Sequence, residues 1–83
     1  MNFSTTEITR YKDFVIEANP PQQGKRTWGT FFVISRERPD GLSRRSFDDD
    51  ATFSSRLDAV HHCFDFGRRI VDGQVVGLSV DDL

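Results

Sequence analysis

Apolar and polar side chains alternate over two early stretches of the chain. In residues 11–18 (YKDFVIEA), Phe14 and Ile16 fall on one side of an extended chain, and Val15 falls on the other with two acidic residues. In residues 27–35 (TWGTFFVIS), both sides of the extended chain carry apolar residues. Alternation with a period of two is typical of β-strands, and a strand that is apolar on both sides is typical of the centre of a sheet. The pattern therefore predicts two strands, the second of them central.

Proline and glycine mark the places where these strands end. An Asn-Pro-Pro sequence opens residues 19–26 and stops the first strand, because proline has no backbone donor for a sheet, so this segment predicts a loop. Residues 38–41 (RPDG) predict a tight turn, since proline presets the second turn position and glycine accepts a positive φ. Residues 42–47 (LSRRSF) form the return strand, whose arginines suit a sheet edge. Three aspartates at residues 48–50 then predict an acidic connector.

After this connector, the period of the apolar residues becomes that of a helix. Ser55 suits the N-cap, with Asp58 three residues later in place of the glutamate of a capping box, and Gly73 suits the C-cap. One continuous apolar stripe is made by Ala59, Val60, Cys63, Phe64, Gly67, Ile70 and Val71. The opposite, polar face holds His61, His62, Asp65, Arg68 and Arg69. This segment is therefore predicted to be an amphipathic helix that packs on the sheet.

The predicted fold class is α+β, with the elements in the order β-β-β-α. The simplest architecture is a three-stranded antiparallel sheet with one C-terminal helix packed on one face. Residues 74–83 are a short apolar tail that packs back as a strand or a turn. Residues 11–83 form a single domain, preceded by residues 1–10 as an arm or a short edge strand. Gly67 lies on the apolar stripe, so we expect the helix to approach a bulky sheet residue such as Trp28 or Phe32.

The length of 83 residues fits one small domain, and the hydrophobic fraction of 36%, with eight Phe, is enough for one core. The single cysteine excludes an internal disulfide and fits a reducing compartment. No apolar stretch approaches the roughly 18–20 residues that span a bilayer, and the N-terminal residues do not resemble a secretory signal. We therefore expect a cytoplasmic protein that has no membrane partner.

Charge is segregated along the chain, although the net charge is only −2. Residues 25–45 hold six basic and two acidic residues, whereas residues 46–83 hold three basic and eight acidic ones. The basic residues of the middle segment are Lys25, Arg26, Arg36, Arg38, Arg44 and Arg45. Basic side chains beside an aromatic residue such as Phe31 on an open sheet are typical of single-stranded nucleic-acid binders. Nucleic-acid binding is therefore one functional hypothesis, with these six residues as its candidate site.

Residue pairs with the spacing of catalytic or metal sites are not evident. His61, His62 and Cys63 diverge around a helix, so they cannot bind one ion together, and zinc sites take at least three protein ligands. Cys63 faces the core, where a thiol is not an available nucleophile. The aspartates at residues 48–50 lack the glycine and late glutamate of a calcium loop. We therefore expect no catalytic residue, no metal and no cofactor, and we expect that the protein is not an enzyme.

Several of these segments resemble a family of small uncharacterised bacterial domains, of proteobacterial type. The resemblance rests on YKDFVIEA at residues 11–18, on Trp28 in an alternating strand, on TFSSRLDAV at residues 52–60 and on HCFDFGRRIVDG at residues 62–73. It covers residues 11–83 and implies a cytosolic bacterial origin. The family has no established activity, so the resemblance implies no site residue.

The second functional hypothesis is protein interaction. If the helix covers one face of the sheet, the other face carries an apolar patch of Tyr11, Val15, Phe31 and Val33, and such patches mark protein contacts. We favour this hypothesis: a non-catalytic interaction or regulatory accessory module, whose partner is another protein or a second copy of the chain. Nucleic-acid binding through the basic hairpin and the open sheet is the alternative.

Overall fold

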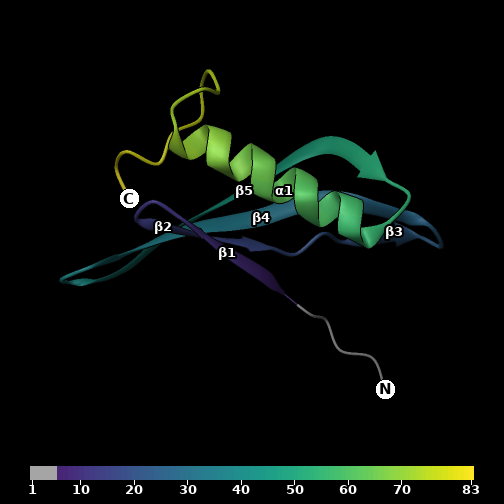
Figure 1. Ribbon diagram of the computed structural model, residues 1–83, viewed down its shortest axis with the longest axis horizontal. Helices are drawn as coiled ribbons and strands as arrows, with labels where there is room; N and C mark the ends of the chain where they lie inside the picture. The colour runs from purple at the N-terminus through teal and green to yellow at the C-terminus, as the bar shows by residue number, and fades with distance from the viewer. Residues whose placement is uncertain (1–5) are drawn as a thin grey trace.

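The computed structural model describes residues 6–83, which form an antiparallel sheet with one helix across one of its faces (Figure 1). The elements in chain order are β1 (Glu7–Tyr11), β2 (Phe14–Ala18), β3 (Gln22–Gly24), β4 (Thr27–Arg38), β5 (Gly41–Phe53) and α1 (Arg56–Val71). β1 pairs with β2, and β4 pairs with β2 on one edge and with β5 on the other. The short β3 pairs with the start of β4, on the edge that β2 uses farther along. The α+β class, the antiparallel sheet and the C-terminal helix are confirmed, but the described residues form five strands and not three.

The segment predicted as one strand, residues 11–18, is divided by a tight turn. Tyr11 is the last residue of β1 and Phe14 is the first of β2, and the two pair directly across the turn. Lys12 has a φ of 56°, in the left-handed region that favours glycine or asparagine. The Lys12-Asp13 sequence gives no such turn signal, so alternation alone predicts a continuous strand where the chain in fact reverses.

Two strands lie in segments for which the prediction was a loop or left a strand open. The prediction for residues 1–10 left an arm and an edge strand open, and residues 7–10 lie in β1, which is an edge strand of the sheet. The prediction for residues 1–5 lies outside the described residues. The loop predicted at residues 19–26 contains β3, whose three residues continue the pairing along β4.

The hairpin of β4 and β5 is longer than predicted, since its strands reach Arg38 and Phe53. The prediction of an acidic connector at residues 48–50 is wrong, because this run lies inside β5. A sheet ladder uses main-chain groups, so aspartates can occupy an edge strand whose side chains reach solvent. Asp48 accordingly lies opposite Phe31 in the register of the two strands.

The ends of α1 follow the sequence signals. The hydroxyl of Ser55 accepts a hydrogen bond from the backbone N–H of Asp58 at 3.0 Å, as an N-cap should. At the other end, Asp72 is the C-cap and Gly73 takes a φ of 72°, where glycine carries no steric penalty. No helix among residues 6–83 has the length and apolar content needed to cross a membrane.

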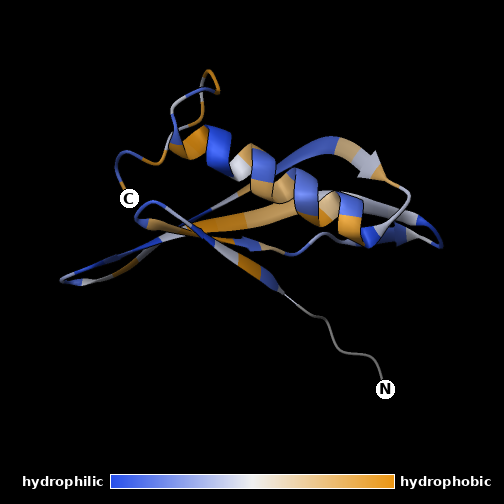
Figure 2. Ribbon diagram, viewed as in Figure 1, coloured by the Kyte–Doolittle hydropathy of each residue, from blue (hydrophilic) through white to orange (hydrophobic). Residues whose placement is uncertain are grey.

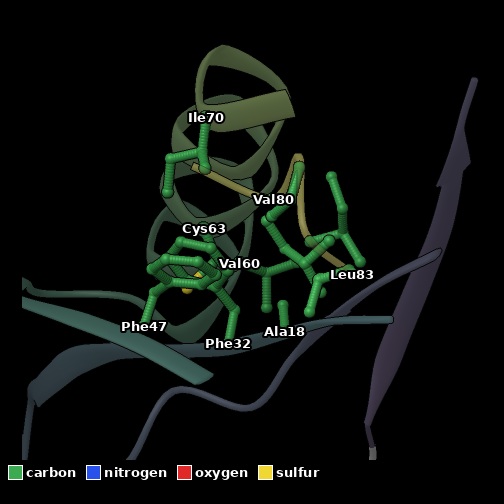
Figure 3. Close-up of a cluster of buried hydrophobic side chains, with 10 residues drawn as sticks. Ala18, Phe32, Phe47, Val60, Cys63, Ile70, Val80 and Leu83 are labelled. Carbon is green, nitrogen blue, oxygen red and sulfur yellow. The ribbon is translucent and has the colours of Figure 1, made fainter. Parts of the chain in front are cut away.

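The core lies between α1 and the sheet, where apolar residues of the helix face those of β2 and β4 (Figure 2). Phe32 is central to it: its ring stacks on Phe47 at 5.5 Å between centroids (Figure 3). The edge of the Phe66 ring meets it at 5.6 Å. The buried cluster consists of Ile16, Ala18, Phe32, Ile34, Phe47, Val60, Cys63, Ile70, Val80 and Leu83. Its members alternate along each strand, which defines one face of the sheet as the helix side.

The segment of residues 74–83 packs back onto the core through turns and not as a strand. Val80 and Leu83 are buried on the helix side (Figure 3), and backbone hydrogen bonds join Leu78 to Val75 and Leu83 to Val80. This segment therefore closes the end of the core that α1 leaves open.

Gly67 brings the helix close to the sheet, as predicted, but the residue it approaches is different. A Cβ at Gly67 would lie 3.0 Å from Cδ1 of Ile16, which is fully buried on β2. Trp28 and Phe32, the residues expected from the sequence, are not the nearest ones. The reason is that β2 is sandwiched between β1 and β4 and passes beneath the middle of α1.

Candidate interaction surface on the open face of the sheet

The sheet has one face that neither α1 nor the tail contacts, which we call the open face. Because residues alternate along a strand, the registers fix which side chains project there. They are Ile8 and Arg10 on β1, Val15 and Glu17 on β2, Phe31, Val33, Ser35 and Glu37 on β4, and Leu42, Arg44, Ser46 and Asp48 on β5. In Figure 1, α1 lies above the sheet and no described element lies against its other face.

The centre of the open face is apolar. Val15, Phe31 and Val33 are only half-buried and are not among the residues packed on the core, and Ile8 is 62% exposed. We call these four residues the apolar patch. An antiparallel sheet with one face in water is normally polar on that face, so an apolar patch of this kind is a candidate interaction surface.

Three of the four residues predicted for this surface, Val15, Phe31 and Val33, do lie together on the open face. Ile8 is an addition to the predicted set, because a single apolar residue within Glu7–Arg10 shows no alternation that would signal a strand. Arg44 and Asp48, which border the apolar patch, are also additions to the residues predicted for this surface. The sequence prediction put residue 48 in a connector after the strand and not on the sheet.

The placement of Tyr11 on this surface is wrong. Tyr11 packs against the core on the helix side, and its hydroxyl donates a 2.7 Å hydrogen bond to Oδ2 of Asp72, the C-cap of α1. Lys12 reaches the other oxygen of the same carboxylate at 2.5 Å. These hydrogen bonds raise the pKa of Tyr11 and of Lys12 and lower the pKa of Asp72. The turn between β1 and β2 is therefore tied to the end of α1.

The six basic residues predicted to form one site are distributed over two faces and two ends of the sheet. Lys25 and Arg26 are exposed in the turn before β4, whereas Arg38 ends that strand, about 40 Å away at 3.3 Å per residue. Arg44 projects on the open face, where its Nη2 lies 3.8 Å from Oε2 of Glu17. The structure therefore does not bring these six basic residues together at one site.

The other three arginines project on the helix side and have partners there. Arg36 lies over the ring of Phe14 at 5.4 Å from its centroid, and Arg38 donates to the backbone carbonyl of Leu83. Arg45 forms two hydrogen bonds to the carboxylate of Asp82, at 2.8 and 2.9 Å, and lowers the pKa of that group. Arg38 and Arg45 thus hold the C-terminal segment, and Arg36 packs on β2. These structural roles compete with ligand binding.

His62 does not lie on the polar face of α1, contrary to the prediction. Its ring lies between Phe53, at 4.9 Å, and Phe66, at 5.8 Å, and its Nε2 is 2.9 Å from Oδ2 of Asp49. Burial alone would raise the pKa of Asp49, but hydrogen bonds from His62, from the N–H of Ala51 and from Thr30 outweigh it and lower that pKa. This pair joins α1 to β5. The sequence held no signal for it, because it depends on the pairing of residues 48–50 with β4.

Cys63, next to this pair in sequence, projects into the core. It is fully buried, and its Sγ lies 3.6 Å from the backbone carbonyl of Phe31. Burial raises the pKa of the thiol, which disfavours the thiolate that nucleophilic chemistry needs. The side chain therefore contributes packing. Among residues 6–83, no three His, Cys, Asp or Glu residues are grouped as a metal site would require.

Comparison with protein families, with curated proteins and with solved structures finds no match to this chain. The resemblance to small bacterial domains thus stays a prediction, and the functional argument rests on the geometry of the open face.

Proposed function

We propose that this protein is a non-catalytic interaction module of the bacterial cytoplasm, an accessory or regulatory subunit that binds a protein partner through the open face. The observation that supports this proposal is the apolar patch, which lies at the centre of a sheet whose opposite face is already filled by α1 and the tail. Burying apolar area of this kind is the main source of affinity in protein association.

The charged residues around the patch support the same role. Arg10, Arg44 and Asp48 border it with both signs of charge, and Glu17 lies within it, between Ile8 and Val33. A border that is mixed in sign selects partners and fixes their orientation, whereas a border of one sign would favour a polyanion or a polycation.

Nucleic-acid binding through the basic hairpin has less support. Arg36, Arg38 and Arg45 have partners on the helix side, and Lys25 and Arg26 lie at the far end of β4. A test is retention of single-stranded nucleic acid at low salt by the wild type and by Arg44→Glu with Arg45→Glu. Retention by the wild type that is lost in the variant would favour this alternative over the proposal.

The proposal is tested by photo-crosslinking in the cells that produce the protein. A benzophenone amino acid placed at Phe31, on the open face, is compared with the same group at Leu57, which is 61% exposed on α1. We expect protein crosslinks from position 31 and none above background from position 57. Equal crosslinking at both positions, or none at either, would contradict the proposal.

A further inference from the structure

We propose that the partner on the open face is a second copy of this chain, related to the first by a two-fold axis that crosses the strands at the row of Val33 and Ser46. This inference rests on the proposed function, since it names the occupant of the same surface. It starts from the register of β4 and β5, in which Val33 lies opposite Ser46, Ser35 opposite Arg44 and Phe31 opposite Asp48.

The charges on β5 are arranged as such an axis requires. Arg44 and Asp48 both project on the open face, two residues to either side of Ser46, and they have opposite signs. Rotation about an axis that runs across the strands through Ser46 places Arg44 of each copy over Asp48 of the other. A two-fold interface needs this reciprocity, because a contact from one residue to a second must recur in the opposite direction.

The same rotation places like apolar residues together. Val33 lies at the axis, so it meets Val33 of the second copy. Ile8 lies in the same row on β1, so it meets Ile8 of the second copy. Two sheets packed in this way lie about 10 Å apart, with their strands within about 30° of each other, so that side chains from both faces fill the space between them. Phe31 of each copy would then lie over the row of Ser35 in the other, beside Val15 on the neighbouring strand.

One acidic residue lies in the row on the axis and must be accounted for. Glu17 sits between Ile8 and Val33, so its carboxylate approaches that of the second copy. Arg44 of the same chain lies 3.8 Å from this carboxylate and compensates its charge. Arg44 is therefore placed between Glu17 of its own chain and Asp48 of the other, which makes it the residue on which this interface depends most.

The size of the face sets the strength of the contact. Twelve side chains project from it, fewer than the roughly 20–30 residues per partner in an interface of standard size. We therefore expect a reversible dimer with a dissociation constant in the roughly micromolar range, populated at high local concentration.

Charge reversal tests this arrangement by sedimentation equilibrium over a range of protein concentrations, with a monomer mass of 9.5 kDa. Arg44→Asp alone and Asp48→Arg alone each place like charges together, and we expect each to weaken the dimer by about tenfold or more. The double variant restores opposite charges across the axis but removes the cation beside Glu17, so we expect it to dimerise more tightly than either single variant without regaining the full wild-type affinity. Arg26→Asp makes the same change of charge in the exposed turn before β4 and should leave the dimer unchanged.

The outcomes separate this inference from the proposed function. A wild type that dimerises, with loss in both single variants and partial recovery in the double, supports the second copy. A dimer that is insensitive to both reversals, or a double variant no better than the singles in spite of a native melting curve, overturns the arrangement. A monomer at all concentrations, with crosslinks from position 31 to a different protein, overturns the second copy and leaves the proposed function standing. A monomer without such crosslinks overturns both.

Discussion

Replacing Gly67 by leucine should destabilise the protein, because the space above this residue is already occupied. A Cβ at Gly67 would lie 3.0 Å from Cδ1 and 3.1 Å from Cγ2 of Ile16, against about 3.5–4.0 Å for an ordinary carbon contact. Leucine adds three further carbons to the same volume. Overpacking of this kind costs about 1–3 kcal/mol, and this case lies toward the upper end because Ile16 is fully buried and has little room to retreat.

The helix propensity of leucine offsets part of this cost. Glycine in a helix interior is less favourable than leucine by somewhat under about 1 kcal/mol, so the net loss expected for Gly67→Leu is about 2 kcal/mol. For a domain of this size, each kcal/mol shifts the melting temperature by about 4–8 °C, so a thermal melt should show a decrease of about 8–16 °C. His61→Leu, at an exposed position of the same helix, should change stability by less than about 0.5 kcal/mol. A melting temperature for Gly67→Leu equal to that of the wild type would refute the packing argument.

A double-mutant cycle identifies the residue responsible. Ile16→Val removes Cδ1, the atom that would lie nearest to a Cβ at Gly67, and by itself should cost about 0.5–1.5 kcal/mol. If the clash is with Ile16, then Gly67→Leu should cost at least about 0.5 kcal/mol less in the Ile16→Val protein than in the wild type. Strict additivity of the two changes would mean that the strain lies elsewhere.

Three further predictions follow from the contacts around the core. Stability should be greatest between about pH 5 and pH 9. The pKa values of Asp49, Asp72 and Asp82 are lowered in the fold, so these carboxylates stabilise it above their unfolded pKa near 3.9, and this stabilisation is lost as pH falls through their folded pKa values. The pKa values of Tyr11 and Lys12 are raised, so the stabilisation from these two groups is present below about pH 10 and is lost as pH rises further. Thermal melts from pH 2 to pH 11 check this, and a melting temperature that does not change with pH would contradict it. Asp49→Ala removes the hydrogen-bond partner of His62 and of the N–H of Ala51, so a urea titration should show that the free energy of unfolding falls by about 1–2 kcal/mol. An unchanged midpoint would contradict a role of Asp49 in joining α1 to β5. Leu83→Ala should lower the free energy of unfolding by about 2 kcal/mol in the same titration, and Arg45→Ala should lower it by less, because Leu83 is buried and the ion pair of Arg45 is exposed. The reverse order would mean that charge and not packing holds the tail.

The parts of the fold that could be predicted are those in which side-chain periodicity and burial agree. The stripe on α1, the Ser55 cap and the alternation in β4 follow directly from packing against a single core. The parts that could not be predicted depend on the main chain. Lys12 adopts a left-handed conformation that its side chain does not favour, and residues 48–50 extend β5 because β4 offers them a pairing edge.

The candidate site was predictable to a similar extent and for similar reasons. Val15, Phe31 and Val33 share a face as soon as the strands are recognised, so the centre of the surface could be found from alternation alone. The charge pattern of Arg44 and Asp48 needs the exact register of a hairpin that extends past the predicted strand end. A shift of register by one residue would turn these side chains to the other face, which is why local sequence could not locate them.

The position of α1 in the chain has a consequence for how the protein is made. All five strands among the described residues precede the helix, so the sheet is synthesised before the segment that covers its core side. Until then, Phe32 and Ile34 are exposed on one face and Phe31 and Val33 on the other. A nascent chain in this state exposes apolar side chains on both faces of the sheet. Chains with such exposed apolar surface misassociate, and chaperones bind them. Docking of α1 covers the first of these faces and leaves only the open face uncovered.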